Sequence, residues 1–134
     1  MTTRATGTFD VKVVPQEPDA YSEEGTLGRM TIDKVLHGDL AGTSRGQMLT
    51  AITSVKTSAG YVAVERVTGT LHGAAGSFTL MHTGSMTRGT PGLVISVVPD
   101  SGTGALTGLT GSFTIIRADG QHSYEFDYDI VPET

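Results

Sequence analysis

A glycine-spaced segment that occurs twice constrains the fold of this 134-residue chain more than any other feature. Residues 69–78 (GTLHGAAGSF) and 104–113 (GALTGLTGSF) match at every glycine, at the leucine and at the final Ser-Phe pair. A degraded third copy begins at Gly38. Because glycine readily adopts the positive φ values that hairpin turns need, each segment predicts a strand end, a turn and the next strand, with Gly76 and Gly111 at equivalent turn positions. The chain is therefore expected to be built from repeated hairpins.

Apolar residues recur elsewhere with a period of two in short runs, which favours strands over helices. About eight antiparallel strands in meander order must close into a barrel or stack as two sheets. Their even spacing favours a single all-β domain over residues 1–134, an eight-stranded antiparallel meander β-barrel. Turns are expected at residues 58–60, 88–92 and 118–120, the last with a strong Asp-Gly hairpin signal. The expected strands cover residues 8–13, 29–36, 47–55, 61–70, 77–86, 93–99, 112–117 and 122–131.

Charge and composition argue against several kinds of partner. The chain carries 9 Lys and Arg against 14 Asp and Glu, a net charge of −5, and its basic residues are scattered singly. This pattern disfavours nucleic acid or an anionic membrane as the main partner. The chain has no cysteine, which fits a reducing compartment, and no apolar segment typical of a signal peptide or a membrane span. A cytoplasmic protein is therefore expected.

Sequence motifs for metal, phosphate or serine-hydrolase chemistry are missing. The histidines at 37, 72, 82 and 122 lack the close spacing of metal ligands, so neither a metal nor another cofactor is expected. The glycines of residues 102–111 are not followed by the Lys-Ser/Thr pair of a phosphate loop. No Gly-x-Ser-x-Gly elbow is present.

Several ordered blocks together resemble a bacterial family known only as domain of unknown function 3224. The blocks are GTFxV at 7–11, KxLxGDLxG at 34–42, ERxxGTLxG at 65–73, GSFxLxHxG at 76–84 and VVPxSGTGxLxGL at 97–109. The resemblance covers almost the whole chain. It implies a small eight-stranded barrel similar in shape to plant allene oxide cyclases and dirigent proteins. Because the family has no settled activity, the resemblance implies a fold and a cavity but no reaction.

Polar residues that interrupt apolar strand faces are the candidates for chemistry, because one face of each barrel strand points into a water-poor interior. Lys34 lies on an otherwise apolar face that begins at Met30, and Glu65 has apolar neighbours on its own face. His82 and Arg117 occupy equivalent positions after the two glycine-spaced segments. If all four side chains point inward, they form a net positive cluster that can transfer a proton or bind an anion.

The same residues also have an ordinary structural interpretation. Lys34 and Arg117 lie near strand ends, so their charges can reach water along their aliphatic stems. The opposite face of this strand, with residues 62, 64 and 66, is also largely apolar. If that face forms the core, Glu65 points outward. Ion pairs that serve only structure perturb one another as well, so clustering alone does not establish a site.

Further side chains are expected to contact a ligand in the barrel. Tyr21 lies in a long polar loop between residues 15 and 28, which is expected to close over the cavity as a lid. Tyr128 belongs to an aromatic face of the last strand, and its phenol can orient a ligand. Met48 and Phe78 are expected to supply apolar contacts.

Three functions fit these patterns. In the first, the barrel is a cofactor-free isomerase, cyclase or lyase, in which His82 or Glu65 moves a proton and Lys34 or Arg117 stabilises developing negative charge. In the second, it carries an apolar, anionic small molecule, and the same cations anchor its carboxylate. In the third, side chains fill the barrel and the protein is a structural or interaction module. Apolar outer faces at residues 62–64 and 94–98 also predict a homodimer or another small homo-oligomer.

Overall fold

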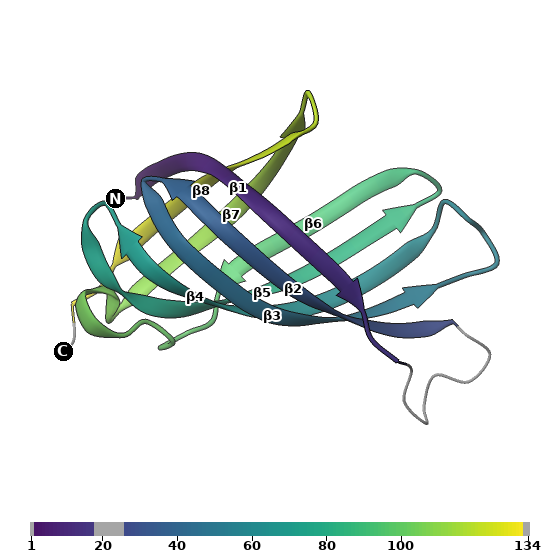
Figure 1. Cartoon of the computed structure of the whole chain (residues 1–134), viewed down its shortest axis with the longest axis horizontal. Helices are drawn as coiled ribbons and strands as arrows, with labels where there is room; N and C mark the ends of the chain where they lie inside the picture. Colours follow the sequence, from purple (N-terminus) through teal and green to yellow (C-terminus); the bar gives the residue numbers. More distant parts are fainter. Residues whose placement is uncertain (1, 18–25, 133–134) are drawn as a thin grey trace.

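The computed structural model describes residues 2–17 and 26–132, and it shows an antiparallel barrel in which each strand pairs with its sequence neighbours and the last pairs with the first (Figure 1). The predicted all-β, eight-stranded meander barrel is confirmed. Within the described residues, no helix is long and apolar enough to cross a membrane. The elements are β1 (Thr3–Pro15), β2 (Leu27–Gly38), β3 (Leu40–Ile52), β4 (Ala59–Leu71), β5 (Ala74–Thr87), β6 (Thr90–Val97), η2 (Gly104–Leu106), β7 (Leu109–Ala118) and β8 (Gln121–Ile130).

Three of the hairpins turn on two residues that both have positive φ. The pairs are His72-Gly73, Arg88-Gly89 and Asp119-Gly120, and their φ values lie between 46° and 90°. Such mirror-image turns match the right-handed twist of paired strands, which explains the glycine at each second position. The hairpin predicted at Asp119-Gly120 is confirmed.

Several predicted boundaries are wrong; β6, for example, starts at Thr90 and not at residue 93, so the turn expected at residues 88–92 is shorter. The turn expected at residues 58–60 lies earlier, because the Thr53 hydroxyl accepts the backbone N–H of Val55 and lies within 3.1 Å of the carbonyl oxygen of Ser58, which closes the loop before β4 begins. The third strand starts at Leu40, not at residue 47. Gly42 and Gly46 resemble turn residues, but both pair within the sheet.

The two glycine-spaced segments share only their second halves. Gly73 and Gly108 both have positive φ, 81° and 88°, and each precedes a strand that buries its phenylalanine. The first halves differ, because residues 69–71 end β4 whereas Gly104–Leu106 form the 3₁₀ turn η2. Gly76 and Gly111 lie within strands and do not have positive φ; a Cβ there would collide with backbone carbonyl oxygens of Thr103 and Asp127 respectively. Their predicted turn role is therefore wrong, and the need for glycine is steric.

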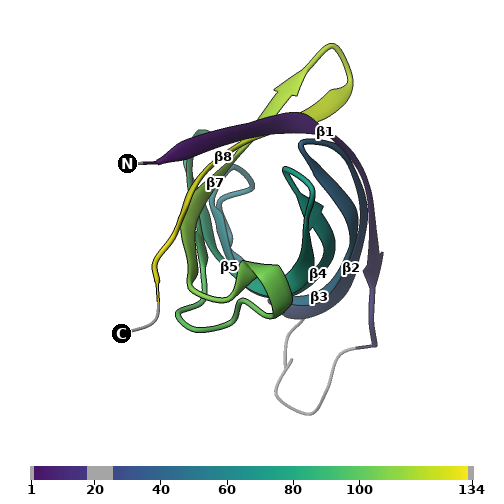
Figure 2. The same cartoon turned by 90° about the vertical axis from the view of Figure 1, so that its left-hand side faces the viewer.

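One end of the barrel is filled by side chains. Leu106 of η2 and Leu109 are both 1% exposed, and the ring of Phe126 stacks between those of Phe78 and Tyr128. The hydroxyl of Tyr124 accepts the backbone N–H of Leu40 at 2.9 Å. Figure 2 views the barrel from this end, where η2 and both chain termini lie. Aromatic and leucine packing therefore closes this end and leaves space only towards the other.

Strands β6 and β7 have fewer paired residues than the other neighbouring strands of the barrel. Of the residues that the structure describes, Ser96 and Ser112 alone pair these two strands. The β7–β8 hairpin then diverges from β6 and rises above the rest of the barrel (Figures 1 and 2). Strands β6 and β7 are therefore joined near the filled end of the barrel and separate from each other towards the open end.

Candidate functional site

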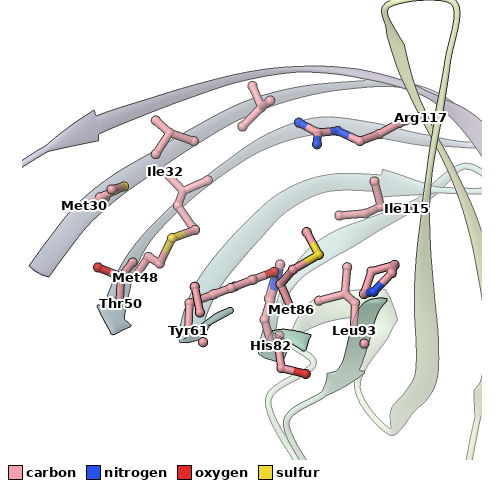
Figure 3. A pocket seen from close by; sticks show the side chains of 18 of the residues that line it. Met30, Ile32, Met48, Thr50, Tyr61, His82, Met86, Leu93, Ile115 and Arg117 are labelled. Carbon is pink, nitrogen blue, oxygen red and sulfur yellow. Dashed lines mark hydrogen bonds between the residues drawn. The ribbon is translucent and has the colours of Figure 1, made fainter. Parts of the chain in front are cut away.

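The barrel holds a cavity of about 530 Å³, which opens at the end opposite to the filled one. Its wall is mostly apolar and includes three methionines, Met30, Met48 and Met86 (Figure 3). Methionine side chains are flexible and adapt to ligands of different shape. The cavity therefore suits an apolar small molecule, and Met48, which is expected to contact a ligand, is among the residues that line it.

Glu65 is the centre of a buried hydrogen-bonded cluster just beneath this cavity. Its Oε2 atom accepts from Lys34 Nζ at 2.9 Å and from His82 Nε2 at 2.5 Å, and its Oε1 atom accepts from Ser44 Oγ at 2.9 Å. The side chains of Glu65, Lys34 and His82 are 1%, 3% and 4% exposed. The structure therefore brings together three of the four polar residues that were expected to converge.

Four successive strands position this cluster. Lys34 lies on β2, Ser44 on β3, Glu65 on β4 and His82 on β5. Lys34 must reach across β3 to meet Glu65, and β3 offers only the small Ser44 and Gly46 at this level. A Cβ at Gly46 would overlap the Cα and Cβ of Glu65. Gly46, which resembles a turn residue in the sequence, thus leaves space within β3 for the ion pair.

Glu65 is ionised despite its burial. Burial alone would raise its pKa, but the hydrogen bond from His82 and the positive charge of Lys34 outweigh that effect and hold the pKa at about 2. An ionised carboxylate can only accept hydrogen bonds, so His82 Nε2 must carry the proton that it shares with Glu65. In the neutral imidazole, Nδ1 is then the unprotonated atom.

Nδ1 of His82 faces Tyr61 on the cavity wall. The Tyr61 hydroxyl lies 3.5 Å from Nδ1, and both residues line the cavity. The ring of Tyr61 lies across Gly84 of β5, where any Cβ would collide with it. Burial, followed by the negative charge of Glu65, raises the pKa of the Tyr61 phenol, so the hydroxyl stays protonated at neutral pH. The cavity floor therefore places an imidazole nitrogen and a phenol hydroxyl side by side.

The Lys34 side chain is almost completely buried. Its ammonium group lies 5.0 Å from the ring centroid of Phe9 and 5.8 Å from that of Phe113, so aromatic faces surround the part that Glu65 does not contact. The alternative that Lys34 reaches solvent along its stem is wrong, because the residue lies in mid-strand. For Arg117, the same alternative is right: the side chain is exposed at the rim and does not contact Glu65.

Two predicted ligand contacts lie outside the cavity. Phe78 is 1% exposed within the filled end, and Tyr128 is packed there against Phe126 with its hydroxyl 2.6 Å from His72 Nδ1. Both residues are on inward faces, as expected, but the strand register places them in the packed layers. Tyr21 lies outside the described residues.

Tyr61 and Ser44 were missed, although the sequence held a signal for each. Once Glu65 is assigned to the inward face of its strand, the period of two assigns Tyr61 to the same face. Ser44 lies between two glycines on the inward face of β3, where small residues indicate a close approach of other side chains.

Within the described residues, no three His, Cys, Asp or Glu side chains form a group that could hold a metal ion.

Comparisons with known proteins agree with this architecture. The chain is 49% identical to a protein of unknown function from Shewanella oneidensis MR-1 whose crystal structure superposes with a TM-score of 0.93. The match covers 99% of this chain and 100% of that chain, and the protein is described as a member of the DUF3224 family. No protein with a curated description matches the chain. A model of the same family of unknown function matches residues 5–128, nearly the whole barrel, so the chain belongs to the DUF3224 family.

Proposed function

We propose that the cavity binds an apolar, anionic small molecule and that His82 acts on it as a general base in a cofactor-free proton transfer of the kind an isomerase, cyclase or lyase uses. The observation that carries this proposal is the hydrogen bond from His82 Nε2 to the buried Glu65 carboxylate, which leaves Nδ1 as the basic atom beside the cavity. A histidine that is oriented by a buried carboxylate is one arrangement that general-base catalysis uses.

Each member of the cluster has a defined part in such a step. Nδ1 of His82 takes a proton from a carbon of the ligand, and the electron pair of the broken C–H bond moves onto an oxygen of the ligand. The Tyr61 hydroxyl donates a hydrogen bond to that oxygen. Glu65 stabilises the imidazolium that forms, and Lys34 keeps the buried carboxylate ionised. The apolar wall lowers the dielectric around the buried cluster, which strengthens each of these interactions.

The base can be tested with 5-nitrobenzisoxazole, a small aromatic probe. Loss of its C3 proton to a base breaks the ring N–O bond and releases a coloured phenolate, so no cofactor is needed. We expect the protein to accelerate this reaction and His82→Gln to lose roughly 100-fold or more of the acceleration. Glutamine keeps a donor for Glu65 but has no basic atom, so the fold is preserved while the chemistry is removed.

His37→Gln is the matched control, because His37 pairs with Asp10 and does not line the cavity. This variant should retain the wild-type rate. Equal rates for wild type, His82→Gln and His37→Gln would show that His82 is not the base.

A carrier without catalysis is the second candidate. The three methionines of the wall favour it, because an adaptable wall accepts several ligands without fixing one reactive geometry. Native mass spectrometry of the purified protein distinguishes the two functions when combined with the benzisoxazole assay. A copurified ligand together with no acceleration would support the carrier.

Self-association is a further prediction from the outer wall. Val62, Val64 and Val94 are 52%, 52% and 68% exposed. On adjacent strands, Leu49 pairs with Val62 and Met81 pairs with Val64. A single-layered barrel has no second layer to cover such a face, so we propose that a second copy does. Sedimentation at micromolar concentration should show a dimer that Val62→Thr combined with Val94→Thr converts to monomer; a monomeric wild type would contradict the prediction.

A further inference from the structure

The cavity is lined by basic side chains and by no acidic ones within the described residues. The basic residues are Lys34, His82, Arg117 and His122. This asymmetry runs against the composition of the chain, in which acidic residues outnumber Lys and Arg by 14 to 9. Lys34 is already neutralised by Glu65. Arg117 at the rim therefore carries the positive charge that an anionic group of a ligand can neutralise.

Arg117 is held in place without being neutralised. Its Nε atom donates to His122 Nε2 at 3.0 Å, which requires that this imidazole nitrogen carry no proton. The ring of His122 packs 5.2 Å from that of Phe9, another residue of the wall. Two other arginines have carboxylate partners, because Arg4 contacts Asp127 and Arg45 lies 3.6 Å from Asp33, whereas Arg66 donates to the Ser77 hydroxyl. Arg117 has a neutral orienting partner instead, and its terminal N–H groups point along the cavity.

The position of Arg117 defines how a ligand would lie. Figure 3 shows Arg117 and His82 across the cavity from each other, with Ile115, Leu93 and Met86 beside the space between them. Arg117 belongs to the part of β7 that diverges from β6, so its guanidinium stands beside the splayed opening. A ligand with one charged end would place that end at the opening and its apolar body and reacting group towards His82.

We infer that Arg117, oriented by His122, binds a carboxylate of the ligand at the rim, and that the ligand is an apolar monocarboxylate reaching from Arg117 to His82. This inference rests on the proposed ligand-binding function of the cavity. A guanidinium presents parallel N–H groups that match the two oxygens of a carboxylate.

The test uses two fluorescent probes that differ only in charge, 6-(dansylamino)hexanoic acid and its primary amide. Fluorescence titrations at about 0.15 M salt should show that wild type binds the acid about tenfold more tightly than the amide. In Arg117→Gln this preference should fall to less than about twofold, while the affinity for the amide stays the same. Arg45→Gln removes an equal charge from the outer wall and should keep the tenfold preference.

Met48→Trp separates failure of this inference from failure of the proposed function. The indole should fill part of the cavity and weaken binding of both probes alike. Equal affinity for acid and amide in wild type, or an unchanged preference in Arg117→Gln, overturns the carboxylate subsite and leaves ligand binding in place. Binding of neither probe, or binding that Met48→Trp does not weaken, overturns the ligand-binding function and the subsite with it.

Discussion

Glu65→Gln is expected to lower the free energy of unfolding by about 3–5 kcal/mol. Glutamine has nearly the same shape, so the loss is electrostatic. The ammonium of Lys34 would remain 3% exposed, between two aromatic rings, without the carboxylate that now lies 2.9 Å away. Breaking one side of a buried ion pair leaves an uncompensated charge, which costs far more than a surface pair contributes. Urea denaturation of the wild type and the variant measures the difference.

The double variant Lys34→Met and Glu65→Gln is the matched control. Methionine is close to lysine in length and removes the stranded charge, so the double variant should recover most of the stability that Glu65→Gln loses. A loss below about 1 kcal/mol in Glu65→Gln, or no recovery in the double variant, would contradict a buried ion pair at this position.

The acid stability of the protein provides a second readout of the same pair. Because the folded-state pKa of Glu65, about 2, lies below its ordinary value of 4.5, the stabilisation is complete above about pH 4.5 and is lost as the pH falls towards 2. Glu65→Gln should lack this component. The difference in stability between the two proteins should therefore shrink as the pH falls through this window.

Gly69→Ala is expected to destabilise the barrel by about 3 kcal/mol, because a Cβ at this position would collide with the backbone of β3 at Ala41 and Gly42. Gly69 pairs with Gly42 on one side and Gly76 on the other, so three adjacent strands approach closely along a row of glycines. Neither backbone can move without breaking the ladder. Thermal and chemical denaturation measure the loss.

Gly60→Ala is the control in the same strand. The nearest atom to a Cβ there is the carbonyl oxygen of Gly84 at 3.7 Å, an ordinary van der Waals distance. This variant should be neutral or slightly stabilising, because alanine has fewer unfolded conformations than glycine. Equal effects of the two substitutions would show that strand glycines act only through backbone entropy and not through close packing.

The fold could be predicted from the sequence because strand periodicity and turn chemistry are local. Asp119-Gly120 specifies its hairpin whatever surrounds it, and the alternation in β8 places Tyr124, Phe126 and Tyr128 inward without knowledge of their partners. Glycines that serve close packing could not be told from glycines that serve turns. Gly42 and Gly46 were therefore assigned outside a strand, and Gly76 and Gly111 were assigned to turns.

The candidate site was predictable to the extent that it depends on which face a residue occupies. Lys34, Glu65 and His82 interrupt inward faces, and the structure joins them in one cluster. The depth of a side chain along the barrel axis depends on the register between strands. The alternation of residues within one strand carries no information on that register. For this reason Phe78 and Tyr128 were assigned to the ligand although they lie in the filled end, and Arg117 was placed in the cluster although it lies at the rim.

The nitrogen NMR spectrum of the histidine-labelled protein at neutral pH tests the central claim most directly, namely that His82 presents a basic nitrogen to the cavity. The Nδ1 and Nε2 signals of a neutral imidazole differ according to which atom carries the proton, and His82→Gln assigns them. We predict that Nε2 of His82 is protonated, towards Glu65, and that Nδ1 is not. A proton on Nδ1, in either the neutral or the charged ring, would contradict the claim, because His82 could then accept no proton from a ligand.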